Sequence, residues 1–152
     1  MDRGPWTGKM LISFILYGIF GWCAEIVWTA GQDVAGALAS GRSIDWKLQG
    51  HTYLWMFPIY GAAGLLFEAT HAAVHAWPWV ARGTTYMLGC FAVEYVTGWL
   101  IQRSTGVIPW DYSDRRWHVH GLIRLDYIPV WFLFGLLLEH VQVVVESVSR
   151  MA

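Results

Sequence analysis

The chain has 152 residues, of which 56% are hydrophobic and 14% are charged, and its formal net charge is −1. A soluble domain has about 25% charged residues, so this composition favours a membrane protein built as one domain, residues 1–152. The near-neutral charge gives no basic surface for nucleic acid, and both cysteines, Cys23 and Cys90, lie in apolar runs where a thiol usually serves as a small hydrophobic group.

Four apolar segments follow one another along the chain. About 20 apolar residues cross a hydrocarbon core of about 30 Å. The expected spans are residues 10–30, 52–73, 80–101 and 128–147. The sequence therefore predicts an all-α integral membrane protein, a multi-pass four-helix transmembrane bundle with a structured polar loop between its third and fourth helices. We expect Pro58 to kink the second helix, and we identify no internal repeat.

Each expected span contains a glutamate within its apolar part. These residues are Glu25, Glu68, Glu94 and Glu139. A charge at the bilayer centre costs about 2.5–3.5 kcal/mol, so these acids should face the bundle interior. Helix direction places Glu25 and Glu94 in a layer beneath the loop at residues 103–127. The other two should form the opposite layer with His71 and His140. Protonated acids that merely hydrogen-bond neighbouring helices are the alternative.

The loop at residues 103–127 is the most polar part of the chain and contains most of the groups that could bind a head group. We expect a polar pocket beneath it, because acids of two spans and arginines of the loop converge there. Its predicted ligand-binding residues are Glu25, Tyr60, Glu94, Asp111, Tyr112 and Arg124. The alternative is a salt bridge from Asp111 or Glu25 to Arg124 that only locks the loop onto the helices.

Metal and nucleophilic sites have weak support in the sequence. Glu68 and His71 have the spacing of a di-iron motif, but the second motif of that design is missing. His118 and His120 lack the cysteines of a zinc finger, and the serines lack a glycine elbow. We therefore expect no metal and no cofactor.

Several motifs together resemble the transmembrane protein 229 family, which is similar to bacterial proteins described as putative ABC-transporter type IV. The motifs are Tyr17…Gly21-x-x-x-Glu25, Pro58-Ile59-Tyr60-Gly61, Glu68, Glu94-Tyr95-x-Thr97-Gly98, Pro109-Trp110-Asp111-Tyr112-Ser113 and Gly121-Leu122-Ile123-x-Leu125-x-Tyr127. The resemblance covers roughly residues 14–140. It implies four membrane spans and no defined reaction, and ATP-driven transport would need a partner that binds the nucleotide.

Three functions are compatible with these features. The first is a non-enzymatic module that binds a lipid or small amphiphile, or serves as a transporter subunit. The second is an intramembrane enzyme acting on a lipid or isoprenoid, with Glu25, Glu94 or Asp111 as acid or base. The third is a structural subunit of a membrane complex. The expected partners are the lipid bilayer, a lipid or amphiphile ligand, and a membrane protein or second copy of the chain.

Overall fold

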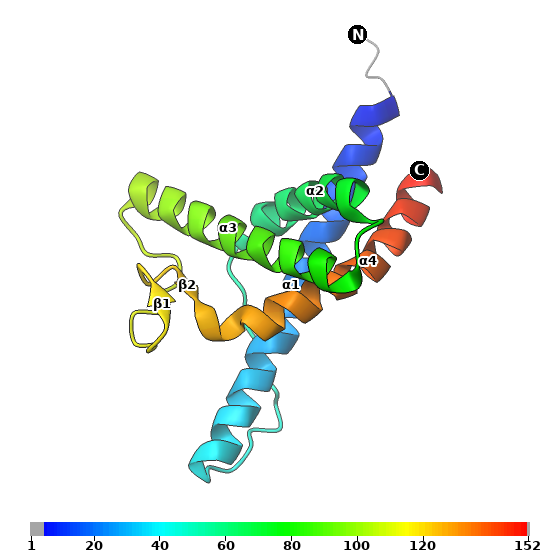
Figure 1. Cartoon of the computed structure of the whole chain (residues 1–152). Coiled ribbons are helices and arrows are strands. Elements are labelled where there is room, and N and C mark those ends of the chain that lie inside the picture. The colour runs from blue at the N-terminus through cyan, green and yellow to red at the C-terminus, as the bar shows by residue number, and fades with distance from the viewer. Residues whose placement is uncertain (1–4, 152) are drawn as a thin grey trace. The chain divides into compact units, whose positions relative to one another are not determined.

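The computed structural model describes residues 5–151, which form four α-helices and a two-stranded hairpin (Figure 1). The helices are α1 (Pro5–Ser40), α2 (Met56–Val74), α3 (Trp79–Thr105) and α4 (Ile128–Met151). The antiparallel strands β1 (His118–Val119) and β2 (Ile123–Arg124) precede the 3-10 turn η1 (Leu125–Tyr127). The prediction of a helical chain with a structured loop between its third and fourth helices is confirmed.

The chain divides into two compact units. The N-terminal unit ends at Leu65, and the C-terminal unit is Leu66–Met151. Helix α2 contributes its first half to the N-terminal unit and its second half to the C-terminal unit. The expectation of a single domain stays a prediction.

Each helix ends beyond the apolar segment that predicted it, and α2 begins at Met56, later than the expected residue 52. The first apolar span was expected at residues 10–30, and helix α1 continues beyond it to Ser40, where Gly41 takes a φ of 68° and Arg42 N donates to Ala37 O at 2.9 Å. Such a left-handed residue is a common helix terminator. Helix α3 ends in the same way before Gly106. Pro58 lies in the first turn of α2, where its missing N–H removes no helical hydrogen bond, so the residue requires no kink.

Within residues 5–151, two helical segments are long and apolar enough to cross a membrane, by length and composition. They are Gly8–Ser40 and Leu125–Met151. Helices α2 and α3 do not meet this criterion; α2 contains Glu68 and His71, and α3 contains Arg82 and Glu94. Crossing by all four helices therefore stays a prediction.

In the N-terminal unit, aromatic rings of one helix fill glycine notches of the other. A Cβ atom added to Gly21 would lie 2.2 Å from Tyr60 Cγ, and one added to Gly64 would lie 2.1 Å from Tyr17 Cγ. In the same way, Gly18 lies against Phe57, and Gly61 against Phe14. Small residues permit this close approach between helices.

These contacts reveal a repeat that we did not predict. Residues 14–21 and residues 57–64 share the pattern Phe-x-x-Tyr-Gly-x-x-Gly. Each of the two rings in one copy packs on one of the two glycines in the other copy. The repeat is only eight residues long and consists of spacing alone, which is why a comparison of whole apolar segments misses it.

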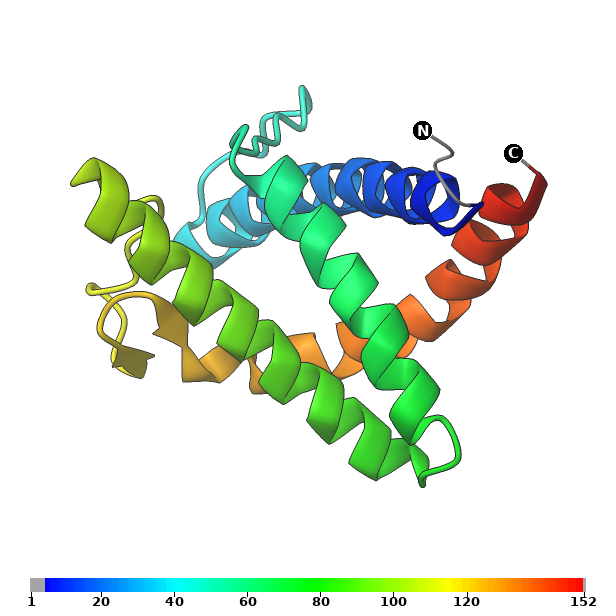
Figure 2. The same cartoon turned by 90° about the horizontal axis from the view of Figure 1, so that it is seen from above.

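In the C-terminal unit, α3 packs against α4, and the β1–β2 loop lies beside the second half of α3 and the start of α4 (Figure 2). The helices again exchange rings and glycines, since Gly83 lies against Phe132 and Gly135 lies against Tyr86. Gly98 on α3 receives Trp110 and Leu122 of the loop. These contacts fix the loop on α3 close to Glu94.

Candidate functional site

The polar loop is held in shape by hydrogen bonds of its own residues, beginning with Trp110 and Asp111. Trp110 Nε1 donates to Leu122 O at 2.9 Å, and Ser113 N donates to Asp111 Oδ1 at 2.9 Å. Tyr112 N donates to Gly121 O at 2.8 Å. The hydrogen bonds from Ser113 lower the pKa of Asp111 below its usual range, so this exposed carboxylate is ionised at neutral pH.

Glycine is required at position 121 of this loop. Gly121 has a φ of 72°, and an added Cβ would lie 2.6 Å from Ser113 Oγ and 2.9 Å from Asp111 Oδ1. Most side chains are strained at such a φ. The motif at residues 110–113 and Gly121 are therefore two halves of one turn. Within this turn, Asp111 is the hydrogen-bond partner of Ser113.

Beneath the loop, three side chains gather around the carboxyl group of Glu94 on α3. Tyr112 and Trp131 make polar contacts with this carboxyl group, and Arg124 interacts with it electrostatically. Even so, the buried atoms Glu94 Oε2 and Trp131 Nε1 have no hydrogen-bond partner of normal geometry among the described residues. We call Glu94, Tyr112, Arg124 and Trp131 the loop cluster. It contains three of the six residues predicted to bind a ligand.

Arg124 is placed in the loop cluster by rings and by a neighbouring acid. Its guanidinium lies 4.2 Å from the ring centroid of Tyr127 and 5.7 Å from that of Tyr112. Arg124 Nε donates to Asp126 Oδ1 at 2.8 Å, and this hydrogen bond raises the pKa of Arg124. Burial raises the pKa of Tyr112, and the nearby Glu94 raises it further. Arg124 therefore forms its salt bridge with Asp126. These two residues, two positions apart in the sequence, help to shape the loop.

The other two predicted site residues, Glu25 and Tyr60, meet in the N-terminal unit. Glu25 Oε2 accepts hydrogen bonds from Thr52 Oγ1 at 2.6 Å and from Tyr60 Oη at 3.0 Å. Glu25 therefore has hydroxyl partners of its own within that unit. The expectation that all six residues form one pocket stays a prediction.

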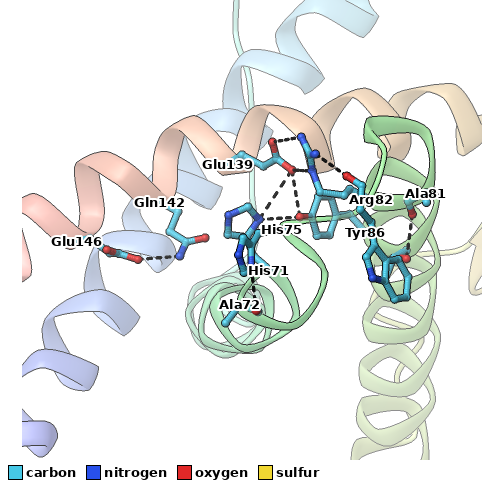
Figure 3. Close-up of polar contacts among 11 residues, drawn as sticks. His71, Ala72, His75, Ala81, Arg82, Tyr86, Glu139, Gln142 and Glu146 are labelled. Atoms are coloured by element: carbon cyan, nitrogen blue, oxygen red, sulfur yellow. Dashed lines mark hydrogen bonds and ion pairs between the residues drawn. The ribbon is translucent and has the colours of Figure 1, made fainter.

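The second acid layer is centred on an ion pair that the sequence analysis missed. Arg82 holds Glu139 through two bonds, Nε to Oε1 at 2.7 Å and Nη2 to Oε2 at 3.0 Å (Figure 3). Tyr86 Oη donates to Glu139 Oε1 at 3.0 Å, and His71 Nδ1 lies 2.7 Å from Tyr86 Oη. We call His71, Arg82, Tyr86 and Glu139 the ion-pair network.

The composition of this layer differs from the expected one. Glu139 and His71 belong to it, whereas His140 is exposed because it points away on the next position of α4. The buried Glu68 Oε1 atom has no hydrogen-bond partner among the described residues. The i, i+4 spacing of Arg82 and Tyr86 on α3 is the signal that could have indicated the network, since it places a guanidinium and a hydroxyl on one helix face.

A groove of about 340 Å³ adjoins the ion-pair network along the second half of α4. Its lining residues are mostly polar, namely His71, Glu139, Gln142, Val143, Glu146, Ser147 and Arg150. Within it, Gln142 Nε2 donates to Glu146 Oε1 at 2.7 Å, and Arg150 Nη2 donates to Glu146 Oε2 at 2.6 Å.

No metal site is formed by the side chains within the described part of the chain. No group of three or more His, Cys, Asp or Glu residues there is arranged to hold an ion. His71, the residue that suggested a di-iron motif, is instead bonded to Tyr86, and Cys23 and Cys90 are free thiols.

Comparison with known proteins identifies a family by sequence. The family model described as putative ABC-transporter type IV matches residues 12–152. No solved structure matches the chain. The match and the two long apolar helices together indicate association with a membrane.

Proposed function

Because the chain belongs to the putative ABC-transporter type IV family, we propose that it is a multi-pass membrane module that binds the polar head of a lipid or small amphiphile in its loop cluster. The family description supports a transporter-related role in a membrane. The head-group ligand is our own inference, and it rests on the loop cluster.

The observation that carries this proposal is a pair of unsatisfied polar atoms. Trp131 makes a polar contact with the Glu94 carboxyl group, but the buried atoms Glu94 Oε2, an acceptor, and Trp131 Nε1, a donor, have no hydrogen-bond partner of normal geometry among residues 5–151. Leaving a buried polar group unpaired costs about 1–3 kcal/mol, so such groups require an explanation. A hydroxyl group both donates and accepts, so one hydroxyl of a head group could serve Glu94 and Trp131 together.

The surroundings of these two atoms suit an amphiphile. Rings of Tyr112, Tyr127 and Trp131 lie next to one another, with centroids 6.3 Å and 6.2 Å apart, and the Arg124 guanidinium, which is paired with Asp126, lies over two of them. Aromatic rings commonly sit where an apolar and a wet region meet. An alcohol or glycerol head group with an apolar tail matches this combination.

A lipid analysis of the detergent-purified protein tests the proposal. Trp131→Phe removes the unpaired N–H but keeps an apolar ring, so it should not lower stability through a lost hydrogen bond. We expect co-purified lipid per protein to fall about tenfold in this variant, as the loss of one buried contact implies. Trp117→Phe, at an exposed ring stacked by Arg116, should retain wild-type lipid. Equal lipid content in all three proteins would contradict a ligand in the loop cluster.

The number of spans has its own test. If all four helices cross, the turn between α2 and α3 lies on the side opposite the α1–α2 loop; if only α1 and α4 cross, both lie on one side. We expect a cysteine at exposed His75 to be labelled from the side opposite one at exposed Asp45, in a background without Cys23 and Cys90. Labelling of both from the same side would contradict four spans.

A further inference from the structure

The groove along the second half of α4 contains a buried polar atom, Gln142 Oε1, that the neighbouring side chains do not satisfy. Gln142 is only 9% exposed, and its buried Oε1 atom has no hydrogen-bond partner among the described residues. Its Nε2 atom is used, because it donates to Glu146 at 2.7 Å. The amide is therefore fixed with its oxygen pointing away from Glu146, toward the side on which the His71 ring lies (Figure 3).

The neighbouring network determines what His71 presents to this groove. The Arg82 guanidinium keeps Glu139 as an acceptor, so the single proton of Tyr86 is donated to Glu139 at 3.0 Å. His71 Nδ1, 2.7 Å from the same hydroxyl, must then donate its own proton to Tyr86. In the neutral ring this assignment leaves His71 Nε2 as an acceptor.

Glu146 supplies a third acceptor and a negative charge. Its carboxylate already accepts from Gln142 and Arg150, at 2.7 Å and 2.6 Å. The groove therefore combines three acceptors of different types on two helices, and one of them is buried and unused.

From this arrangement we propose that the groove binds a primary ammonium group, of either a free amine or an aminophospholipid. A primary ammonium carries three N–H donors and no acceptor, which matches Gln142 Oε1, His71 Nε2 and the Glu146 carboxylate. Charge-assisted bonds of this kind are the stronger ones. Arg150, which lines the groove, is 69% exposed and donates one N–H to Glu146, has further N–H groups for the phosphate of a lipid head group. This site is separate from the loop cluster, and its existence does not depend on the lipid proposed there.

A comparison of methylated and unmethylated head groups tests the ammonium directly. Phosphatidylcholine keeps the charge of phosphatidylethanolamine but has no N–H donor. In native mass spectrometry of the detergent-purified full chain, we expect phosphatidylethanolamine to bind about tenfold better than phosphatidylcholine. Free ethanolamine and choline form the second arm. Competition by ethanolamine supports recognition of the amine by itself, and binding of the lipid without competition supports a lipid source. Equal binding of both lipids together with equal weak binding of both amines would overturn the proposal.

Variants test whether the preference for phosphatidylethanolamine depends on the groove. Gln142→Leu removes the unpaired oxygen, and the preference for ethanolamine head groups should disappear. His140→Gln, a change at an exposed site on the same helix, should keep the preference, as should Trp131→Phe in the loop cluster. Retention of the full preference in Gln142→Leu would overturn the assignment of the groove. The wild-type comparison of the two lipids remains decisive if that variant does not fold.

Discussion

The two units of this protein use the same helix-packing device but treat polar groups differently. In the N-terminal unit, two copies of one aromatic–glycine pattern pack on each other, and the acid Glu25 is satisfied by two hydroxyls. In the C-terminal unit, ring–glycine contacts also join α3 and α4, yet several buried polar atoms there lack partners. Since packed scaffolds seldom leave buried polar groups unpaired, we propose that the first unit supports the fold and that the second binds the ligand.

The largest loss of thermal stability should come from adding a side chain at a glycine contact in the N-terminal unit. Gly64→Ala places a Cβ 2.1 Å from Tyr17 Cγ and 2.5 Å from Tyr17 Cβ, which are atoms close to the backbone. Overpacking of this kind costs about 1–3 kcal/mol, and we expect the upper end, a Tm lower by about 10 °C in detergent. Gly36→Ala is the matched control, because nothing lies within 4 Å of its added Cβ and alanine favours a helix. Similar Tm values for the two variants would contradict the interlock.

A smaller loss of thermal stability is expected from a substitution in the ion-pair network of the C-terminal unit. Glu139→Leu leaves the Arg82 guanidinium and the Tyr86 hydroxyl without their shared acceptor. The side chains of the pair are 22% and 17% exposed, so water moderates the loss, and we expect a Tm lower by about 5 °C. The double variant Arg82→Met, Glu139→Leu should recover most of this loss, because no unpaired charge remains. A double variant that is no more stable than the single one would show that the charge pair is not the cause.

The smallest effect should come from the hydroxyl pair around Glu25. Thr52→Val removes the donor at 2.6 Å but leaves Tyr60, so we expect a loss of about 1 kcal/mol, or about 3 °C in Tm. Thr84→Val is the control, since the Thr84 hydroxyl is exposed and bonds only the Val80 carbonyl one turn earlier. Co-purified lipid should be unchanged in both variants. A loss of lipid in Thr52→Val would contradict the division of roles between the units.

Hydropathy predicted the existence and order of the helices but not their ends. Helix α1 loses its apolar character near Gly31 and still continues to Ser40, because apolarity reports burial in lipid whereas helix ends are set by backbone hydrogen bonds and by residues such as Gly41. The local turn around Asp111 was likewise beyond reach, since its partner Gly121 becomes adjacent only when the loop closes.

Part of the candidate site could be predicted from the positions of charged residues along the sequence. Glu94, Tyr112 and Arg124 do come together, because an acid just past the middle of one span leans toward the side on which the following loop lies. Arg82 was missed because a charge near the edge of an apolar run looks like a solvated loop residue. Its partner Glu139 lies 57 positions away, and no local pattern records that pairing.

The reciprocal notches also constrain how this sequence can vary in evolution. A larger residue at position 64 is tolerated only if position 17 loses bulk at the same time, and the same holds for positions 21 and 60. Each such exchange passes through an intermediate that is either overpacked or hollow, and both are unstable. Substitutions at these positions should therefore be accepted as coupled pairs, so that the helix contact covaries as a unit while the exposed faces of the same helices drift freely.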